Sequence, residues 1–196
     1  MTSVRKLLLS LLIVGVAGSV AAFGVLSAFS STTANPGNEF QAGTVAIGDN
    51  DSGTALYNNA NAAPGESVTK CIKVTYSGSL DADVRLYVAD AVGALAQYVD
   101  LTIQPGDFPG APPAGNACTG FNADGAAAFD DTLANFRSSH NSWASGLVDN
   151  PGSDSDWSEN DSVVYQITAT VQSDAPNSAQ DTTTNVHAFT WEARNN

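Results

Sequence analysis

Histidine, cysteine and carboxylate side chains are the groups in this sequence that could bind a metal or act as nucleophiles. The two histidines, His140 and His187, lie far apart, and neither belongs to the H-E-x-x-H pattern that places two imidazoles and a base around zinc. The G-x-S-x-G elbow of serine hydrolases and the glycine-rich loops that hold phosphates are also missing from the sequence. The sequence therefore offers no catalytic residue and no metal ligand set, and we expect a protein that is not an enzyme.

An acidic stretch near the C-terminal third is the best candidate for a cation site. Carboxylate oxygens are the ligands that Ca²⁺ prefers, and this stretch supplies Asp149, Asp154, Asp156, Glu159 and Asp161. The spacing differs from that of an EF-hand, because Glu159 occupies the position that needs glycine. A solvated acidic turn is the alternative, so we expect no cofactor and keep Ca²⁺ as the second interpretation.

The two cysteines, Cys71 and Cys118, match neither a zinc pattern nor a redox C-x-x-C pair. In an exported protein such a pair is typical of a disulfide. Closing a loop of 118 − 71 = 47 residues would stabilise the fold by about 4 kcal/mol on the chain-entropy model. Two buried free thiols are the alternative.

The N-terminus has the composition of a secretory signal. Arg5 and Lys6 precede residues 7–29, which contain no ionisable side chain and are long enough to cross a bilayer as a helix. The later part is rich in Gly, Ala and Ser, which suits a signal peptidase better than a permanent anchor. A cut after Ala28 or after Ala22 fits the small residues, and a retained anchor is the alternative.

Removal of residues 1–28 would leave 196 − 28 = 168 residues, the size of one domain with its own core. The two basic residues of the signal leave with it, so the net charge becomes 5 − 20 = −15. Such a charge repels nucleic acid and anionic lipid. We therefore expect no nucleic-acid partner, and contact with a membrane only through the uncleaved signal.

Beyond residue 38, apolar residues recur at every second position in short runs that Gly, Pro, Asn, Asp and Ser separate. This alternation predicts strands over residues 39–47, 54–58, 67–76, 82–90, 97–104, 162–171 and 185–193. One apolar face per strand needs a second sheet to cover it. We expect an all-β fold, a jelly-roll-like antiparallel β-sandwich preceded by an apolar signal helix.

The segment between the fifth and sixth predicted strands differs in kind. Residues 105–125 hold too many Pro and Gly for regular structure, and a bridged Cys118 would pin this segment to the sheet. Phe129, Leu133 and Phe136 then recur at helical spacing. They predict one short helix that packs on the sandwich.

Several stretches, in this order along the chain, resemble the TasA/camelysin family of bacterial surface and biofilm-fibre proteins. After the apolar segment come "SAF", "FQAGTVAI", "APGESVTKCIKVTYSGSLDADVRLY" and "PNSAQDTTTNVHAFTWEA". In that family a signal peptidase of the SipW type cuts just before a phenylalanine, which implies a cut between Ala28 and Phe29. The family motif F-x-A-G-T matches residues 40–44.

The resemblance implies a signal peptide over 1–28, an N-terminal extension over 29–38 and a β-sandwich domain over 39–196. It also implies a secreted or cell-surface subunit that assembles with itself into extracellular, biofilm-matrix fibres. In that family a freed N-terminal segment inserts as a donor strand into the next subunit; here it would comprise Phe29, Ser30, Ser31, Thr32, Thr33, Ala34 and Asn35. A cell-surface metalloendopeptidase of the camelysin type and a monomeric adhesion module are the alternatives.

Overall fold

The computed structural model describes residues 41–152 and 154–196. The chain divides into two compact units, Met1–Gln41 and Ala42–Asn196. The expected signal, its cleavage between Ala28 and Phe29 and the donor strand from Phe29 to Asn35 lie outside the described residues. Within the described part, no helix combines the length and the apolar character needed to cross a membrane.

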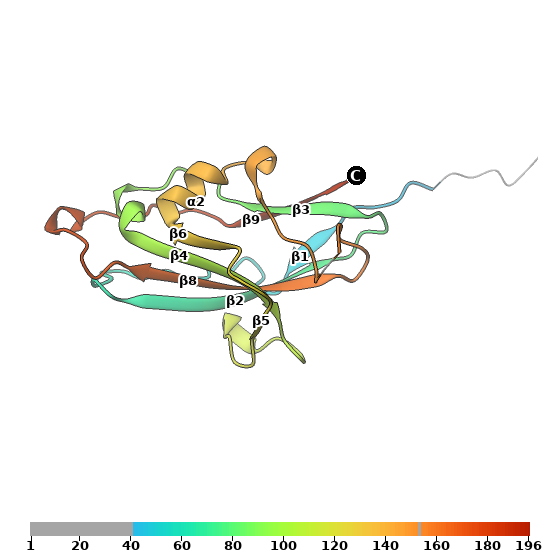
Figure 1. Ribbon diagram of the computed structural model, residues 1–196, viewed down its shortest axis with the longest axis horizontal. Coiled ribbons are helices and arrows are strands. Elements are labelled where there is room, and N and C mark those ends of the chain that lie inside the picture. The colour runs from blue at the N-terminus through green and yellow to red at the C-terminus, as the bar shows by residue number, and fades with distance from the viewer. Residues whose placement is uncertain (1–40, 153) are drawn as a thin grey trace, which may run out of the picture. The chain divides into compact units, whose positions relative to one another are not determined.

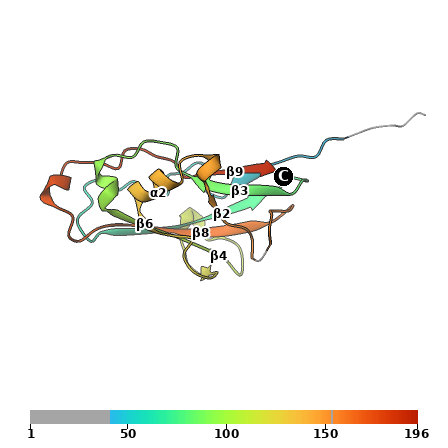
Figure 2. The same ribbon diagram turned by 45° about the horizontal axis from the view of Figure 1, so that its top comes forward.

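The second unit consists of two antiparallel sheets (Figures 1 and 2). The larger sheet has the order β1-β2-β8-β4-β5, with β6 also paired to β4. Its strands are β1 (Ile47–Asp49), β2 (Ser67–Tyr76), β8 (Ser162–Val171), β4 (Val99–Asp107), β5 (Asn122–Ala123) and β6 (Phe129–Thr132). The smaller sheet has the order β7-β3-β9, formed by β7 (Leu147–Val148), β3 (Ala82–Tyr87) and β9 (Thr190–Asn195).

One hydrophobic core joins the two sheets. The inward-facing residues of β2, β8 and β4 alternate with polar outward residues, as in Ile72, Val74 and Tyr76 of β2. From the smaller sheet, Val84 and Leu86 enter the same core, each at most 2% exposed. The prediction of an all-β fold built from antiparallel sheets is therefore confirmed.

One short α-helix packs over the sheets, as predicted. Helix α2 (Leu133–Ser139) begins at Thr132, whose hydroxyl accepts a hydrogen bond from the backbone of Asn135 at 3.2 Å. Its buried residues are Leu133 and Phe136. Phe129, predicted to share the helix, instead lies in β6, and its ring meets that of Phe136 edge-on at 4.9 Å. Four short 3₁₀ helices complete the unit: η1 (Ala94–Tyr98), η2 (Ala114–Asn116), η3 (Trp143–Ser145) and η4 (Asn177–Ala179).

Five of the seven predicted strands differ from those observed. Two differ only in their bounds, since 82–90 is observed as Ala82–Tyr87 and 97–104 as Val99–Asp107. Of the run over 39–47, only Ile47 among the described residues 41–47 belongs to a strand, and the run over 54–58 is not a strand. The run over 185–193 becomes a strand only at Thr190. Leu56 and Tyr57, which are adjacent in sequence, both pack against the core, whereas neighbouring residues of a strand face opposite ways. That packing is the physical reason why this segment is not extended.

The predicted disulfide between Cys71 and Cys118 is present, with Cα atoms 5.2 Å apart. It ties residues 108–121, which connect β4 to β5, to the outer face of the larger sheet, and Figure 1 shows this connection projecting from that sheet around β5. Gly106 of β4 allows β5 to lie this close to β4, because a Cβ atom at residue 106 would be 2.0 Å from the carbonyl oxygen of Asn122 in β5. The Pro/Gly-rich segment is thus pinned to the sheet as predicted.

Candidate functional site

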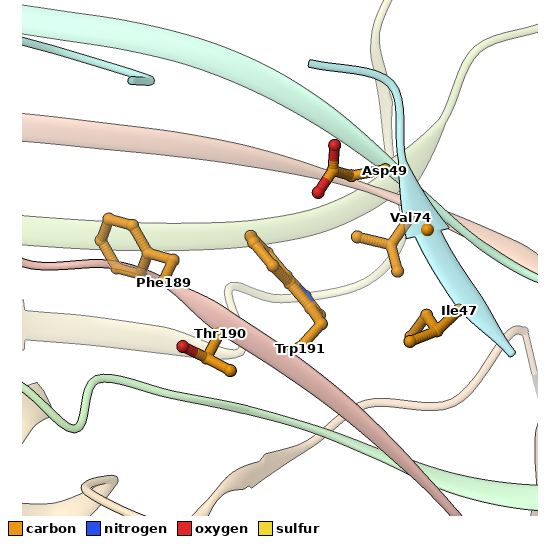
Figure 3. A pocket seen from close by; sticks show the side chains of 7 residues that line it. Ile47, Asp49, Val74, Phe189, Thr190 and Trp191 are labelled. Carbon is orange, nitrogen blue, oxygen red and sulfur yellow. The ribbon is translucent and has the colours of Figure 1, made fainter. Parts of the chain in front are cut away.

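A groove separates β1, an edge strand of the larger sheet, from β9, an edge strand of the smaller one (Figure 3). It has a volume of about 220 Å³ and is lined by Ile47, Gly48, Asp49, Val74, Phe189, Thr190 and Trp191. Ligand pockets for small molecules usually measure about 300–1,000 Å³. The groove is therefore too small for such a ligand, and its size suits one or two side chains of a neighbouring segment.

The backbone of β9 is open on the side of this groove. Ala82 of β3 exchanges both of its backbone hydrogen bonds with Trp157, at 3.0 and 2.9 Å. Because hydrogen-bonding directions alternate along a strand, Asp83, Arg85 and Tyr87 face β9 instead. Their partners in β9 are residues 194, 192 and 190. The backbone groups of Trp191 and Ala193 consequently point away from β3, and within the described part of the chain no strand pairs with them.

The backbone of β1 is open in the same way. The backbone N–H of Tyr76 in β2 donates to Asp161 at 2.9 Å, so the neighbouring residues of β2 face β1. Ser77 accordingly donates to Ala46 at 2.8 Å. Alternation then turns the backbone groups of Ile47 and Asp49 away from β2. Among the described residues no strand pairs with that edge.

Trp191 forms the aromatic wall of the groove (Figure 3). Its ring lies 5.4 Å from that of Tyr165, which is 1% exposed. The indole N–H of Trp191 is buried and has no hydrogen-bond partner in the described structure. Burial raises the pKa of the Tyr165 phenol well above its ordinary value, and the negative charge of Asp149 raises it further. The wall is thus firmly packed.

A tight turn ends β1 at the mouth of the groove. The Asp49 carboxylate accepts from the backbone of Asp51 at 3.1 Å, and the Asp51 carboxylate accepts from that of Gly53 at 2.8 Å. Ser52 and Gly53 have φ values of 56° and 76°, and such left-handed values occur in turns. Burial and then the hydrogen bond from Asp49 raise the pKa of Asp51.

The acidic residues predicted as alternative calcium ligands do not converge. Asp156 accepts hydrogen bonds from Ser155 and Asn196, whereas Asp161 accepts from the backbone of Ser158 at 2.7 Å. Burial raises the pKa of Asp149, whose backbone oxygen accepts from the Trp157 indole at 3.0 Å. Within residues 41–152 and 154–196, no three His, Cys, Asp or Glu side chains gather as a metal would need.

The two histidines occupy separate, hydrogen-bonded positions. His140 lies beside the rings of Phe129 and Phe136, and its Nδ1 is 2.8 Å from the backbone oxygen of Ser145. His187 has Nδ1 2.9 Å from the backbone oxygen of Asn185 and Nε2 2.7 Å from the Tyr57 hydroxyl. Since a carbonyl only accepts, His187 donates from Nδ1, and Tyr57 therefore donates to Nε2. Each imidazole thus holds nearby loop residues in place through hydrogen bonds.

Sequence reasoning placed Phe189 and Trp191 on one face of a strand but did not identify the groove. The alternation of apolar and polar residues indicates which residues of a strand face the core. It does not indicate whether another strand pairs with the backbone on each side. Neither the family models nor the curated proteins that were searched contain a match to this chain.

Proposed function

We propose that this protein is an exported structural subunit that assembles with itself into extracellular or biofilm-matrix fibres. The observation that supports the proposal is the groove between β1 and β9, where two unpaired backbone edges border an apolar wall made by Ile47, Val74, Phe189 and Trp191. Unpaired strand edges attract further strands.

The strand that fills the groove in this proposal comes from the N-terminal extension of another copy. Residues 29–38 contain no charged side chain and are rich in Ser and Thr up to Pro36 and Gly37. An extended segment from Phe29 to Asn35 would pair with the backbone of β9 or β1 and place Phe29 against Trp191. Main-chain pairing supplies the affinity in such β-augmentation, and the side-chain pocket sets the register.

Cleavage between Ala28 and Phe29 by a signal peptidase of the SipW type would control assembly. Before the cut, the extension is tied to the apolar segment and cannot enter a neighbour. After the cut, the subunit is free at the cell surface or outside the cell. The proposal includes a jelly-roll arrangement of the sandwich, in keeping with the family that the sequence resembles.

The deciding experiment removes the donor strand. Deleting residues 29–35 from the exported protein should leave a folded sandwich with an unchanged melting temperature and no filaments in electron micrographs. A synthetic peptide of residues 29–38 added in excess to the intact protein should cap growing filaments. N-terminal sequencing of the exported form should begin at Phe29.

The same preparations distinguish the alternatives. Filaments that form with wild-type kinetics after the deletion would refute the donor strand. A mature protein that stays monomeric at high concentration would favour an adhesion module. Stoichiometric zinc together with chelator-sensitive cleavage of casein would favour the endopeptidase.

A further inference from the structure

Residues 67–72 of β2 have an unpaired backbone edge in the described structure, on the side opposite β8 and away from the groove. Only Val74, Thr75 and Tyr76 of β2 pair with β1. The preceding residues, 67–72, pair with β8 on one side, and no strand in the described structure lies on the other. By the alternation that turns Tyr76 toward Asp161, the backbone groups of Thr69 and Cys71 point to this open side. An edge of this kind is normally a site for pairing with a second copy.

Lys70 is the one charged residue on the inward-facing side of β2. Its cross-strand partner is Ile167, which is 1% exposed, and its neighbours on the same face are Val68 and Ile72. The lysine side chain is only partly buried there, as its ammonium group requires. A strand added at this edge would cover that ammonium group without offering it a partner, and burying an unpaired charge is costly.

Asn50 occupies the place where the next residue of β1 would bind. Its side-chain oxygen accepts a hydrogen bond from the backbone N–H of Lys73 at 2.7 Å. The turn formed by Asp49, Asp51 and Gly53 then leads the chain away from β2. One backbone donor at the edge is thereby satisfied without a strand, and the incoming strand would first have to displace the amide.

We propose that Lys70 and Asn50 guard this half of β2 against pairing with β2 of a second copy. The inward position of the lysine is one of the devices by which β-proteins block their edges. Of the two edge strands at the groove, β9 presents Trp191 and Ala193 on its inward face, whereas β1 presents Ile47 together with Asp49, whose carboxylate lies at the mouth of the groove. Pairing of two copies through this half of β2 is thereby disfavoured. The guard does not depend on the donor-strand proposal.

The test compares two lysines of the same strand. Lys70→Val removes the inward charge, and Lys73→Val removes a charge from the opposite face of β2. Both substitutions are made in the intact exported chain and again together with Ile47→Lys, which places a charge in the groove. Sedimentation measures self-association, and thermal melting verifies the fold of each variant.

Lys70→Val should lower the concentration of half-association by about tenfold or more relative to Lys73→Val, with or without the charge at residue 47. Equal behaviour of the two variants, whether both monomeric or both associated, would overturn the proposal, because the inward position would then have no effect. If Lys70→Val fails to fold, Lys70→Thr replaces it with the same expected result. A loss of filaments in the Ile47→Lys single variant tests the fibre proposal and does not test the role of Lys70 and Asn50.

Discussion

The edge of β2 at residues 67–72 and the edges of β1 and β9 at the groove differ in what borders them. The half of β2 formed by residues 67–72 carries the inward-facing Lys70, and Asn50 caps its next backbone donor. The edges of β1 and β9 border a groove of mixed polar and apolar character instead, with Trp191 along its wall and Asp49 at its mouth. Natural β-proteins usually block their free edges. On this comparison the half of β2 is the less favourable site for an added strand, and the groove is the proposed one.

The protected half of β2 is also the covalently anchored half. Cys71 lies on the outer face of β2, and its bond to Cys118 holds residues 108–121 against the sheet. The groove has no such constraint: β1 is three residues long and ends in a turn. The disulfide therefore constrains the half of β2 at residues 67–72 and not the strands at the groove.

The largest expected effect comes from removing that anchor. Replacing Cys71 and Cys118 together by serine should lower the free energy of unfolding by about 4 kcal/mol, because the closed loop of 47 residues no longer restricts the unfolded chain. Denaturant titration of the intact chain measures the loss. The groove and its edges are untouched, so filaments should still form under conditions where the double variant is folded.

An unfolding free energy equal to that of the wild-type protein would contradict this prediction. The wild-type protein in reductant is the matched control, and it should unfold at the same denaturant concentration as the double variant. If the double variant folds but no longer associates, the disulfide-anchored half of β2 takes part in assembly as well as the groove.

The second prediction transfers a guard from one edge to the other. Ile47→Lys adds a second charge to the inward face of β1, beside Asp49, and an added strand would have to bury both charges. Filament formation should be abolished, with a small change in melting temperature because Ile47 is only partly buried. Thioflavin fluorescence and electron micrographs measure assembly.

Val186→Lys is the matched control, because Val186 is 96% exposed and does not line the groove. It changes the net charge by the same amount as Ile47→Lys and should assemble as the wild-type protein does. Filaments formed equally well by Ile47→Lys would show that the groove is not the assembly site.

The sequence predicts the strands of the protected part well and those of the groove poorly. Ser67–Tyr76 and Ser162–Val171 were predicted with their observed bounds, because long runs with one apolar face are typical of strands with partners. The runs over 39–47 and 185–193 show similar alternation, yet only Ile47–Asp49 and Thr190–Asn195 become strands. Whether such a run forms a strand depends on the strands beside it, and the alternation within one run carries no information about those neighbours.

The groove itself illustrates what sequence alone omits. Phe189 and Trp191 were expected on one inward face, and both line the groove. Their position at an edge follows from contacts between β3 and β9 that lie far apart in sequence. Lys70 is visible in the sequence as a charge within an alternating apolar run. That this charge lies at an unpaired edge follows only from the structure, in which β1 ends at Asp49 and does not reach Lys70.

The smallest expected effect concerns a carboxyl near the aromatic wall of the groove. Burial raises the pKa of Asp149, so the folded state prefers this group protonated. Its contribution to stability is present below the ordinary aspartate pKa of about 4 and is lost as the pH rises through the higher folded-state pKa. Asp149→Asn should therefore raise the melting temperature at pH 7 by a few degrees at most and change it little at pH 3.

Asp131 supplies a control of opposite sign on the far side of the larger sheet. The backbone N–H of Thr132 and the amide of Asn135 donate to its carboxylate, at 2.6 and 2.9 Å, and lower its pKa. Its stabilisation is present above the unfolded-state pKa and is lost as the pH falls through the folded-state value. Asp131→Asn should therefore lower the melting temperature at pH 7, and its difference from the wild-type protein should narrow as the pH falls below the ordinary aspartate pKa of about 4. A lower melting temperature for Asp149→Asn at pH 7 would mean that its carboxylate is stabilised by contacts within the fold, and that the wall behind Trp191 is held by charge as well as by packing.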